Sequence, residues 1–293
     1  MKSLWRLMKT AIDGWQSDFA SSMGAALAYY TVFSMAPLLV IVIAIAALAF
    51  GHSTAQQEIM TQARDLFGAQ GAGALETMLE NARKPEQGIV ASALSLVALV
   101  LGAIGVFNEL ESDLNRIWKV PTTRHAGWWG LVRSRLLSFG MVIAIGFLLL
   151  VSLVLSAALA ALGTYWSGVF AELEVLLQAA NFAVSFGVIT VLFAIIYKFL
   201  PKTRIEWRDV WIGAAVTALL FTIGKLLIGM YLGKSSVASS YGAAGSLVIL
   251  LLWVYYSAQI FLLGAEFTKA FTESHGSRRN APASPPSNPL RGG

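Results

Sequence analysis

The histidines and carboxylates of the sequence are the residues from which a metal-dependent hydrolase would be built. Such an enzyme needs His, Asp and Glu side chains clustered around one ion. The chain has three histidines and no cysteine, and the topology predicted below places His52 on the opposite membrane side from the other two. Glu109, Glu111 and Asp113 alternate along a predicted helix, so the three do not share a face. The sequence therefore predicts no catalytic residue, no metal site and no cofactor.

Polar residues inside long apolar stretches are the remaining candidates for function. They are costly within a bilayer, so a polar group at that depth is a candidate for a substrate path or gate. The first stretch also carries a proline, which removes a backbone hydrogen bond to Phe33 and predicts a kink. The candidate substrate-path or gating residues are Tyr29, Tyr30, Ser34, Pro37, Lys225, Tyr255, Gln259 and Glu266.

Several candidates have a second interpretation that the sequence leaves open. Lys225 can face a substrate or extend its charge to the outer interface. Gln259 can line a polar path or hydrogen-bond a neighbouring helix. Pro37 can shape a site or be tolerated without one. The basic partners expected for Glu266 at the inner surface are Lys198, Lys202 and Arg208.

These candidates must be positioned by helices that cross a bilayer. Hydrophobic residues make up 57% of the 293 and charged residues 13%, whereas soluble domains have about 25% charged residues. A span needs roughly 20 mostly apolar residues. Six blocks meet this length, at 25–50, 89–107, 136–162, 182–200, 211–232 and 245–271. The predicted fold class is all-α, a polytopic membrane helix bundle with six transmembrane helices.

The lysines and arginines predict the orientation of this bundle, because they concentrate on the cytoplasmic side of membrane proteins. With the N-terminus inside, the inner segments hold sixteen of the 21 basic residues and the outer segments hold four, while Lys225 lies within a span. The prediction is therefore N-in/C-in. The inner basic residues favour anionic lipid headgroups. We expect no nucleic-acid partner, because these residues are spread over four segments.

The sequence divides into three regions. Residues 1–23 form a predicted cytoplasmic interfacial amphipathic helix. Residues 24–271 form the six-helix transmembrane domain, with an outer helical hairpin at 51–88 whose two runs are separated by glycines at 68, 71 and 73. That hairpin can be a lid or a packing element. Residues 272–293, rich in Ser, Pro and Arg, are predicted to be a disordered cytoplasmic tail.

Six short segments follow one another in a distinctive order. They are AALAYYTVFSMAPL at 25–38, LNRIW at 114–118, YKFLP at 197–201, WRD at 207–209, LWVYY at 252–256 and LGAE at 263–266. Together they resemble the YihY/BrkB family of bacterial inner-membrane proteins, and the likeness runs from about residue 5 to 271. The old family label, ribonuclease BN, is not carried over, because no metal cluster can be assembled.

The resemblance implies a multi-pass protein of the bacterial cell inner (plasma) membrane, and the lack of clustered His and carboxylate ligands predicts that it is not an enzyme. The resemblance also implies a transporter or translocation factor for an amphipathic envelope molecule, of lipid or lipopolysaccharide type. Membrane lipids and an envelope lipid or lipopolysaccharide precursor are the expected partners. The alternative is a structural or partner-binding membrane protein of the cell envelope without transport activity. Substrate, direction, energy source and homo-oligomer formation stay open.

Overall fold

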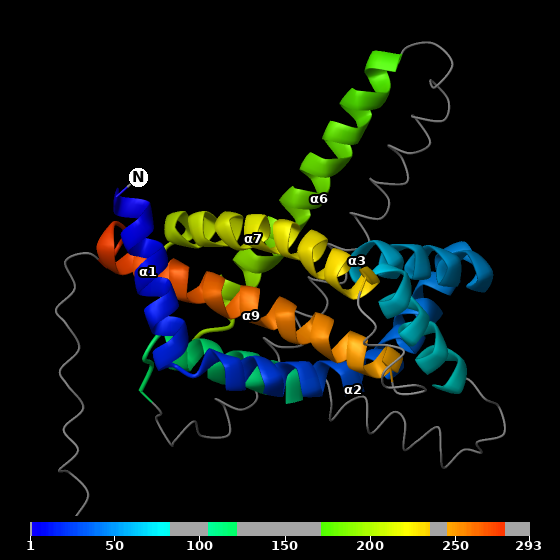
Figure 1. The fold of residues 1–293 in the computed structure, drawn as a ribbon, viewed down its shortest axis with the longest axis horizontal. Coiled ribbons are helices and arrows are strands. Elements are labelled where there is room, and N and C mark those ends of the chain that lie inside the picture. Colours follow the sequence, from blue (N-terminus) through cyan, green and yellow to red (C-terminus); the bar gives the residue numbers. More distant parts are fainter. Residues whose placement is uncertain (1, 83–104, 122–170, 235–244, 279–293) are drawn as a thin grey trace, which may run out of the picture.

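The computed structural model describes residues 2–82, 105–121, 171–234 and 245–278. Within these residues the regular structure is entirely helical, which confirms the all-α fold class for this part of the chain. The helices are α1 (Lys2–Ser17), α2 (Ala20–Phe50), α3 (His52–Ala82), α6 (Ala171–Phe199), α7 (Trp207–Lys234) and α9 (Gly245–Ser274), and residues 105–117 are also helical (Figure 1).

Three of the described helices are long and apolar enough to cross a membrane. They are Ala179–Phe199, Trp207–Tyr231 and Leu247–Ser274, and they coincide with the fourth, fifth and sixth predicted spans. The first predicted span, 25–50, lies within α2. The third and nearly all of the second lie outside the described residues. The number of six spans and the N-in/C-in orientation therefore stay predictions.

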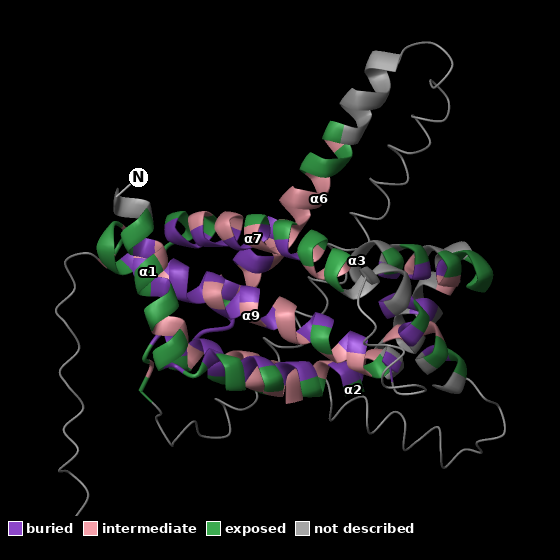
Figure 2. Cartoon of the chain, in the orientation of Figure 1, coloured by how far each residue is buried: buried purple, intermediate pink, exposed green. Residues whose placement is uncertain are grey.

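Helix α9 is the central helix of the bundle. It packs against α7 on one side and α2 on the other (Figure 1), with α1 and α3 also in contact. Half of its most apolar stretch is buried inside the protein, against 22% in α6 and 28% in α7. Polar side chains on α9 are therefore surrounded by other helices, and this is where a buried site can form (Figure 2).

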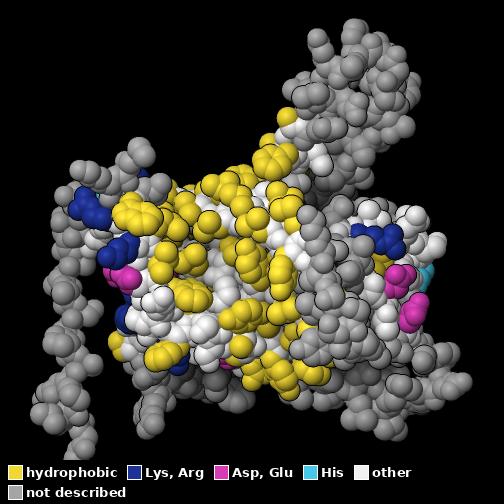
Figure 3. Space-filling view, in the orientation of Figure 1, with side chains coloured by type: hydrophobic (Ala, Val, Ile, Leu, Met, Phe, Trp, Pro, Cys, Tyr) yellow, Lys and Arg dark blue, Asp and Glu magenta, His cyan; other side chains and the backbone are white. Residues whose placement is uncertain are grey.

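The opposite situation holds on the outside of α7, where large apolar side chains are exposed. They are Leu219, Ile223, Leu226, Leu227, Met230 and Tyr231. Figure 3 shows hydrophobic side chains covering much of this face of the bundle. Exposed apolar area of this extent is unfavourable in water and suited to lipid chains.

Helix α1 is amphipathic and lies across the end of α9. Its Leu7 and Ala11 are buried against Phe267 and Ala270 of α9, while Trp5 stays 74% exposed. The apolar face predicted for the interfacial helix is thus occupied largely by another helix. Trp5 and Ile12 remain exposed on α1, and an exposed tryptophan is typical of a membrane interface.

Helix α3 covers most of the segment where a helical hairpin was predicted. The structure has one helix from His52 to Ala82, yet Arg64 Nη2 lies 4.0 Å from Glu76 Oε2. Twelve residues of straight helix rise about 18 Å, which is further than these two side chains can span. The helix therefore bends between the two residues, in the region of the predicted glycine break.

The end of α9 departs from the predicted boundary of the tail. The helix continues to Ser274, and Asp209 Oδ2 accepts hydrogen bonds from the backbone N (2.9 Å) and Oγ (2.7 Å) of Ser277. Arg278 Nη2 donates to the Arg204 carbonyl at 2.9 Å. Residues 272–278 thus belong to the helical domain, because polar groups on the α6–α7 linker and α7 hold them.

Helices α6, α7 and α9 approach one another closely at Gly264. Tyr197 Oη donates to the Phe261 carbonyl at 2.7 Å and lies 3.2 Å from Thr217 Oγ1. A Cβ added at Gly264 would lie 2.0 Å from Thr217 Oγ1 and 2.7 Å from Tyr197 Oη. Only a residue without a side chain lets these three helices share the polar contact.

We expect Gly264→Ala to destabilise the protein by about 1–3 kcal/mol, because the helices must separate to admit the methyl group. Thermal unfolding in detergent would measure this as a lower Tm. Gly187→Ala is the matched control, since no described atom lies within 4 Å of a Cβ built there. An unchanged Tm for Gly264→Ala would contradict the close packing described here.

Candidate functional site

The predicted inner end of the bundle is where the segments used above for the family resemblance meet. Apolar residues of two of them, Leu114, Ile117, Trp118 and Leu200, form one buried cluster with the nearby Ile205 and Val210. Polar contacts close this end. Asn115 Oδ1 accepts a hydrogen bond from Lys202 N at 2.7 Å, and Lys202 forms an ion pair with Glu111.

Beside this cluster, four charged side chains form what we call the carboxyl cluster: Asp18, Lys119, Glu266 and Lys269. Asp18 forms an ion pair with Lys119, and Lys269 Nζ lies 3.9 Å from Glu266 Oε2. The carboxyl groups of Asp18 and Glu266 lie near each other. Both residues are buried, and Asp18 Oδ2 and Glu266 Oε1 have no hydrogen-bond partner among the described residues.

The backbone around the Asp18–Lys119 ion pair is unusual. Phe19 and Lys119 have φ values of 60° and 51°, and they are the non-glycine residues of the described part with positive φ. Lys119 ends the helix at 105–117, where its N–H bonds the Arg116 carbonyl and Val120 N–H bonds the Asn115 carbonyl. Glycine is the usual residue at such a helix end. A lysine in this left-handed conformation makes the fold less stable than a glycine would, by roughly 1 kcal/mol.

Further along α9, two more polar residues face α2 in line with Glu266. Gln259 Nε2 donates to the Ala20 carbonyl at 3.3 Å, while its Oε1 is buried with no partner among the described residues. Tyr255 packs on the apolar cluster that includes Ala28. We call Tyr255, Gln259 and Glu266 the polar seam of α9.

Glycines let the polar seam lie close to α1 and α2. A Cβ at Gly14 would lie 2.5 Å from Glu266 Oε2, and one at Gly24 would lie 2.0 Å from Gln259 Nε2. The seam is therefore closed and tightly packed here. Opening it requires the α1–α2 corner, which consists of Asp18 and Phe19, to move away from α9.

Comparison with known proteins gives this geometry a family. The model of the family described as "Virulence factor BrkB" matches residues 11–288 of the chain. The chain belongs to the virulence factor BrkB family. The match includes α2, α3, α6, α7, α9 and the C-terminal part of α1 from residue 11, so the carboxyl cluster and the polar seam lie inside the family region.

Curated relatives of this BrkB family protein are named as membrane proteins. The UPF0761 membrane protein of Alcanivorax borkumensis is 27% identical over 267 residues, which cover 90% of this chain and 60% of the relative. That of Ralstonia nicotianae is 35% identical, covering 59% and 38%, and that of Stenotrophomonas maltophilia is 30% identical, covering 84% and 56%. The aligned residues thus cover 60% or less of each relative's length.

These names place this BrkB family protein in a membrane and name no reaction. No solved structure matches the chain. Within the described residues, no group of three His, Asp or Glu side chains is placed to hold a metal ion.

The sequence-predicted candidates of this BrkB family protein fall into two groups. The polar seam brings three of them together on one face of α9. Two of the three basic partners expected for Glu266 are engaged elsewhere, since Lys198 donates to the Ile205 carbonyl and Lys202 pairs with Glu111. The third, Arg208, lines a cavity away from Glu266, so the expectation is corrected. Glu266 lies too deep for them, and Lys269 and Asp18 face it instead.

The other candidates lie away from the seam. Tyr29 and Tyr30 are exposed on α2, 57% and 37% respectively, with their rings 5.7 Å apart. Ser34 is buried and donates to the Tyr30 carbonyl at 2.6 Å. Lys225 is half-buried on α7. The backbone of Pro37 lies within α2, and its predicted kink stays a prediction.

Sequence reasoning missed Asp18 and Lys119 as members of this site. Asp18 lies in the interfacial helix predicted for residues 1–23, and Lys119 lies near the end of a helix predicted for residues 108–120, so both look like ordinary polar residues on helix surfaces. They lie 101 positions apart, and no local spacing joins them. The usable signal was a carboxylate directly before a long apolar stretch, since such a residue is buried by the helices that follow.

Another buried carboxyl group, that of Asp113, lies beyond the predicted second span. It is 3% exposed, and its Oδ2 has no partner among the described residues. Burial and the neighbouring Glu109 raise the pKa of Asp113 from 3.8 to about 7, against the opposing charge of Arg116. The folded protein therefore retains this proton at pH values where the unfolded chain has lost it.

We expect stability to fall as pH rises through this window. Because the folded pKa is raised, the contribution of Asp113 is full below pH 3.8 and is lost as pH approaches about 7. Asp113→Asn should flatten the dependence of Tm on pH and raise Tm most near neutral pH. Asp13→Asn, an exposed change on α1, should leave the profile unchanged. Parallel profiles for wild type and Asp113→Asn would contradict the assignment.

Proposed function

We propose that this BrkB family protein translocates an amphipathic envelope molecule, of lipid or lipopolysaccharide type, across the bacterial inner membrane. In this proposal the chain crosses the membrane six times, with both ends in the cytoplasm. The alternative is a structural or partner-binding protein of the envelope. Both agree with membership of the family and with the membrane proteins named among the relatives.

The polar seam is the observation that carries the proposal. Gln259 and Glu266 lie on the central helix, within the stretch long and apolar enough to span a membrane. Each has a buried oxygen without a partner among the described residues. An unsatisfied buried polar atom costs about 1–3 kcal/mol, so apolar residues would serve a purely structural contact better. A path for polar headgroups gives these residues a use.

An amphipathic substrate suits the rest of the molecule. The exposed apolar side chains of α7 can contact acyl chains, whereas the polar seam can contact a headgroup once the α1–α2 corner separates from α9. That corner consists of Asp18 and Phe19, between Ser17 and Ala20. In the proposal, the Asp18–Lys119 ion pair holds the corner closed, and its rupture opens the seam.

Proteoliposomes test the proposal directly. Vesicles containing the pure full chain should move a fluorescently labelled phospholipid or lipid-linked glycan between leaflets faster than empty vesicles. Gln259→Leu should slow this movement by about tenfold, the size expected for losing one polar contact to a moving headgroup. Gln16→Leu, on the exposed surface of α1, is the control. Equal rates in filled and empty vesicles for every labelled molecule would favour the structural alternative.

A further inference from the structure

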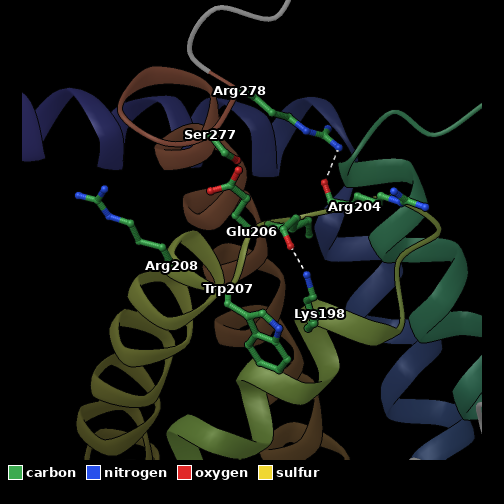
Figure 4. Close-up of a pocket in the computed structure, with 8 residues that line it drawn as sticks. Lys198, Arg204, Glu206, Trp207, Arg208, Ser277 and Arg278 are labelled. Carbon is green, nitrogen blue, oxygen red and sulfur yellow. Dashed lines mark hydrogen bonds between the residues drawn. The ribbon is translucent and has the colours of Figure 1, made fainter.

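A cavity of about 830 Å³ opens at the predicted inner face, away from the polar seam. It lies between the end of α6, the linker to α7 and the residues after α9 (Figure 4). Its volume falls in the range of about 300–1,000 Å³ that is usual for small-molecule sites. We call it the inner-face basic cavity. Its lining includes Lys198, Arg204, Glu206, Trp207, Arg208 and Arg278.

Four of these residues are cations and one is a carboxylate. No carboxylate in the described part of the chain forms an ion pair with Lys198, Arg204, Arg208 or Arg278. The nearby carboxylate of Asp209 is buried and accepts two hydrogen bonds from Ser277. The four cations outnumber the single carboxylate in the lining, that of Glu206, and a bound anion would offset the excess positive charge.

Two of the cations are held in place and two are free at the rim. Lys198 donates to the Ile205 carbonyl and lies 5.4 Å from the centre of the Trp207 ring. Arg278 donates to the Arg204 carbonyl, and its guanidinium lies 5.4 Å from the ring of Trp118. Arg204 and Arg208 extend to opposite sides of the opening (Figure 4). Arginine binds phosphate oxygens through paired N–H groups, so each of these side chains by itself suits a phosphate.

The position of the cavity indicates where that phosphate would come from. Trp207 and Trp211, 45% and 44% exposed, begin α7 beside the cavity, and exposed tryptophans mark the headgroup level of membrane proteins. The apolar surface of α7 follows directly along the same helix. A lipid could therefore place its phosphate among the cations and its acyl chains along α7.

We propose that the inner-face basic cavity binds the phosphodiester of an anionic phospholipid headgroup from the adjacent leaflet. The proposal does not depend on transport, since a fixed lipid would also stabilise a purely structural protein. A soluble phosphate would present the same phosphate group to the cavity as a lipid headgroup. The two ligands differ because only the lipid has acyl chains that can add to the binding.

Binding to the purified full chain in a neutral detergent tests the proposal. The probes are a short-chain phosphatidylglycerol, a short-chain phosphatidylcholine, glycerol phosphate and inorganic phosphate, each titrated against Tm and by native mass spectrometry. We expect phosphatidylglycerol to bind at least about tenfold more tightly than each of the others. If glycerol phosphate or inorganic phosphate binds as tightly, the lipid assignment is overturned and the site belongs to a soluble phosphate.

Variants locate the binding. The double change Arg204→Gln and Arg208→Gln should weaken phosphatidylglycerol binding by at least about tenfold. Without lipid, its Tm should stay equal or rise, because two repelling charges are removed. The matched control is Arg6→Gln with Lys9→Gln, which removes the same charge from exposed positions of α1. Equal weakening in both double variants, or none in either, would overturn the cavity as a built site.

Discussion

Replacing Lys119 with alanine is expected to lower the free energy of unfolding by about 3 kcal/mol, a large effect for one exposed lysine. The reason lies in its partner. The Lys119 side chain is 55% exposed, but that of Asp18 is only 6% exposed. Removing the ammonium leaves a buried carboxyl group next to Glu266 with no cation in direct contact. Chemical or thermal unfolding in detergent would measure the loss.

Two further variants separate charge from backbone strain. Lys119→Gly removes the same charge but accepts φ 51° without cost, so it should be about 1 kcal/mol more stable than Lys119→Ala. Asp18→Asn in the Lys119→Gly background removes the uncompensated carboxyl group and should restore most of the stability. Lys9→Ala, an exposed change on α1, is the control. A loss for Lys119→Ala no larger than that control would show that the ion pair contributes nothing.

The helices and their apolar character were predictable from the sequence, because they follow from local composition. A block of about 20 apolar residues has few alternatives to a membrane helix. The fourth, fifth and sixth predicted blocks correspond to the three described helices suited to span a membrane. The amphipathic pattern of α1 is also local, and it predicted the helix. It did not predict that the apolar face of α1 would pack against α9.

The site was predictable only where its members lie on one helix. Tyr255, Gln259 and Glu266 share a face of α9, and helical spacing joins them. Asp18 and Lys119 joined the site through tertiary packing between distant segments, which spacing cannot reveal. The same limit explains why the partners of Glu266 were predicted wrongly. The basic residues expected beside it lie at a similar predicted depth in the membrane. The packing of the α1–α2 corner on α9 instead places Asp18 next to it, and Lys269 of α9 also lies beside it.

Tertiary packing also explains the inner-face basic cavity. Its cations come from α6, the linker, α7 and the chain after α9. In the sequence they look like scattered inner-side positive charges that only report orientation. Once Trp118 and Trp207 stack with two of them, those charges acquire fixed positions and a common opening. Residues whose charges predict an orientation can therefore also line a cavity.

Replacing Glu266 with glutamine is expected to slow substrate movement in proteoliposomes by at least about tenfold while leaving stability equal or higher. The two effects have separate causes. The carboxyl groups of Asp18 and Glu266 lie near each other, and each has an oxygen without a hydrogen-bond partner among the described residues. A glutamine amide keeps the size of the side chain and can donate to Asp18 Oδ2, so the folded protein should gain a hydrogen bond. The lost contact with Lys269, at 3.9 Å, is a weak one.

Function should fall because that added hydrogen bond holds the α1–α2 corner more firmly against α9. In the proposal, the polar seam must open to admit a headgroup. A hydrogen bond that stabilises the closed form therefore raises the free energy needed for opening by the same amount. Glu273→Gln makes the identical chemical change at an exposed position near the end of α9 and should alter neither measurement. A Glu266→Gln protein that is less stable and slower would instead identify Glu266 as a structural residue. One that is as stable and as fast as wild type would remove the polar seam from the substrate path.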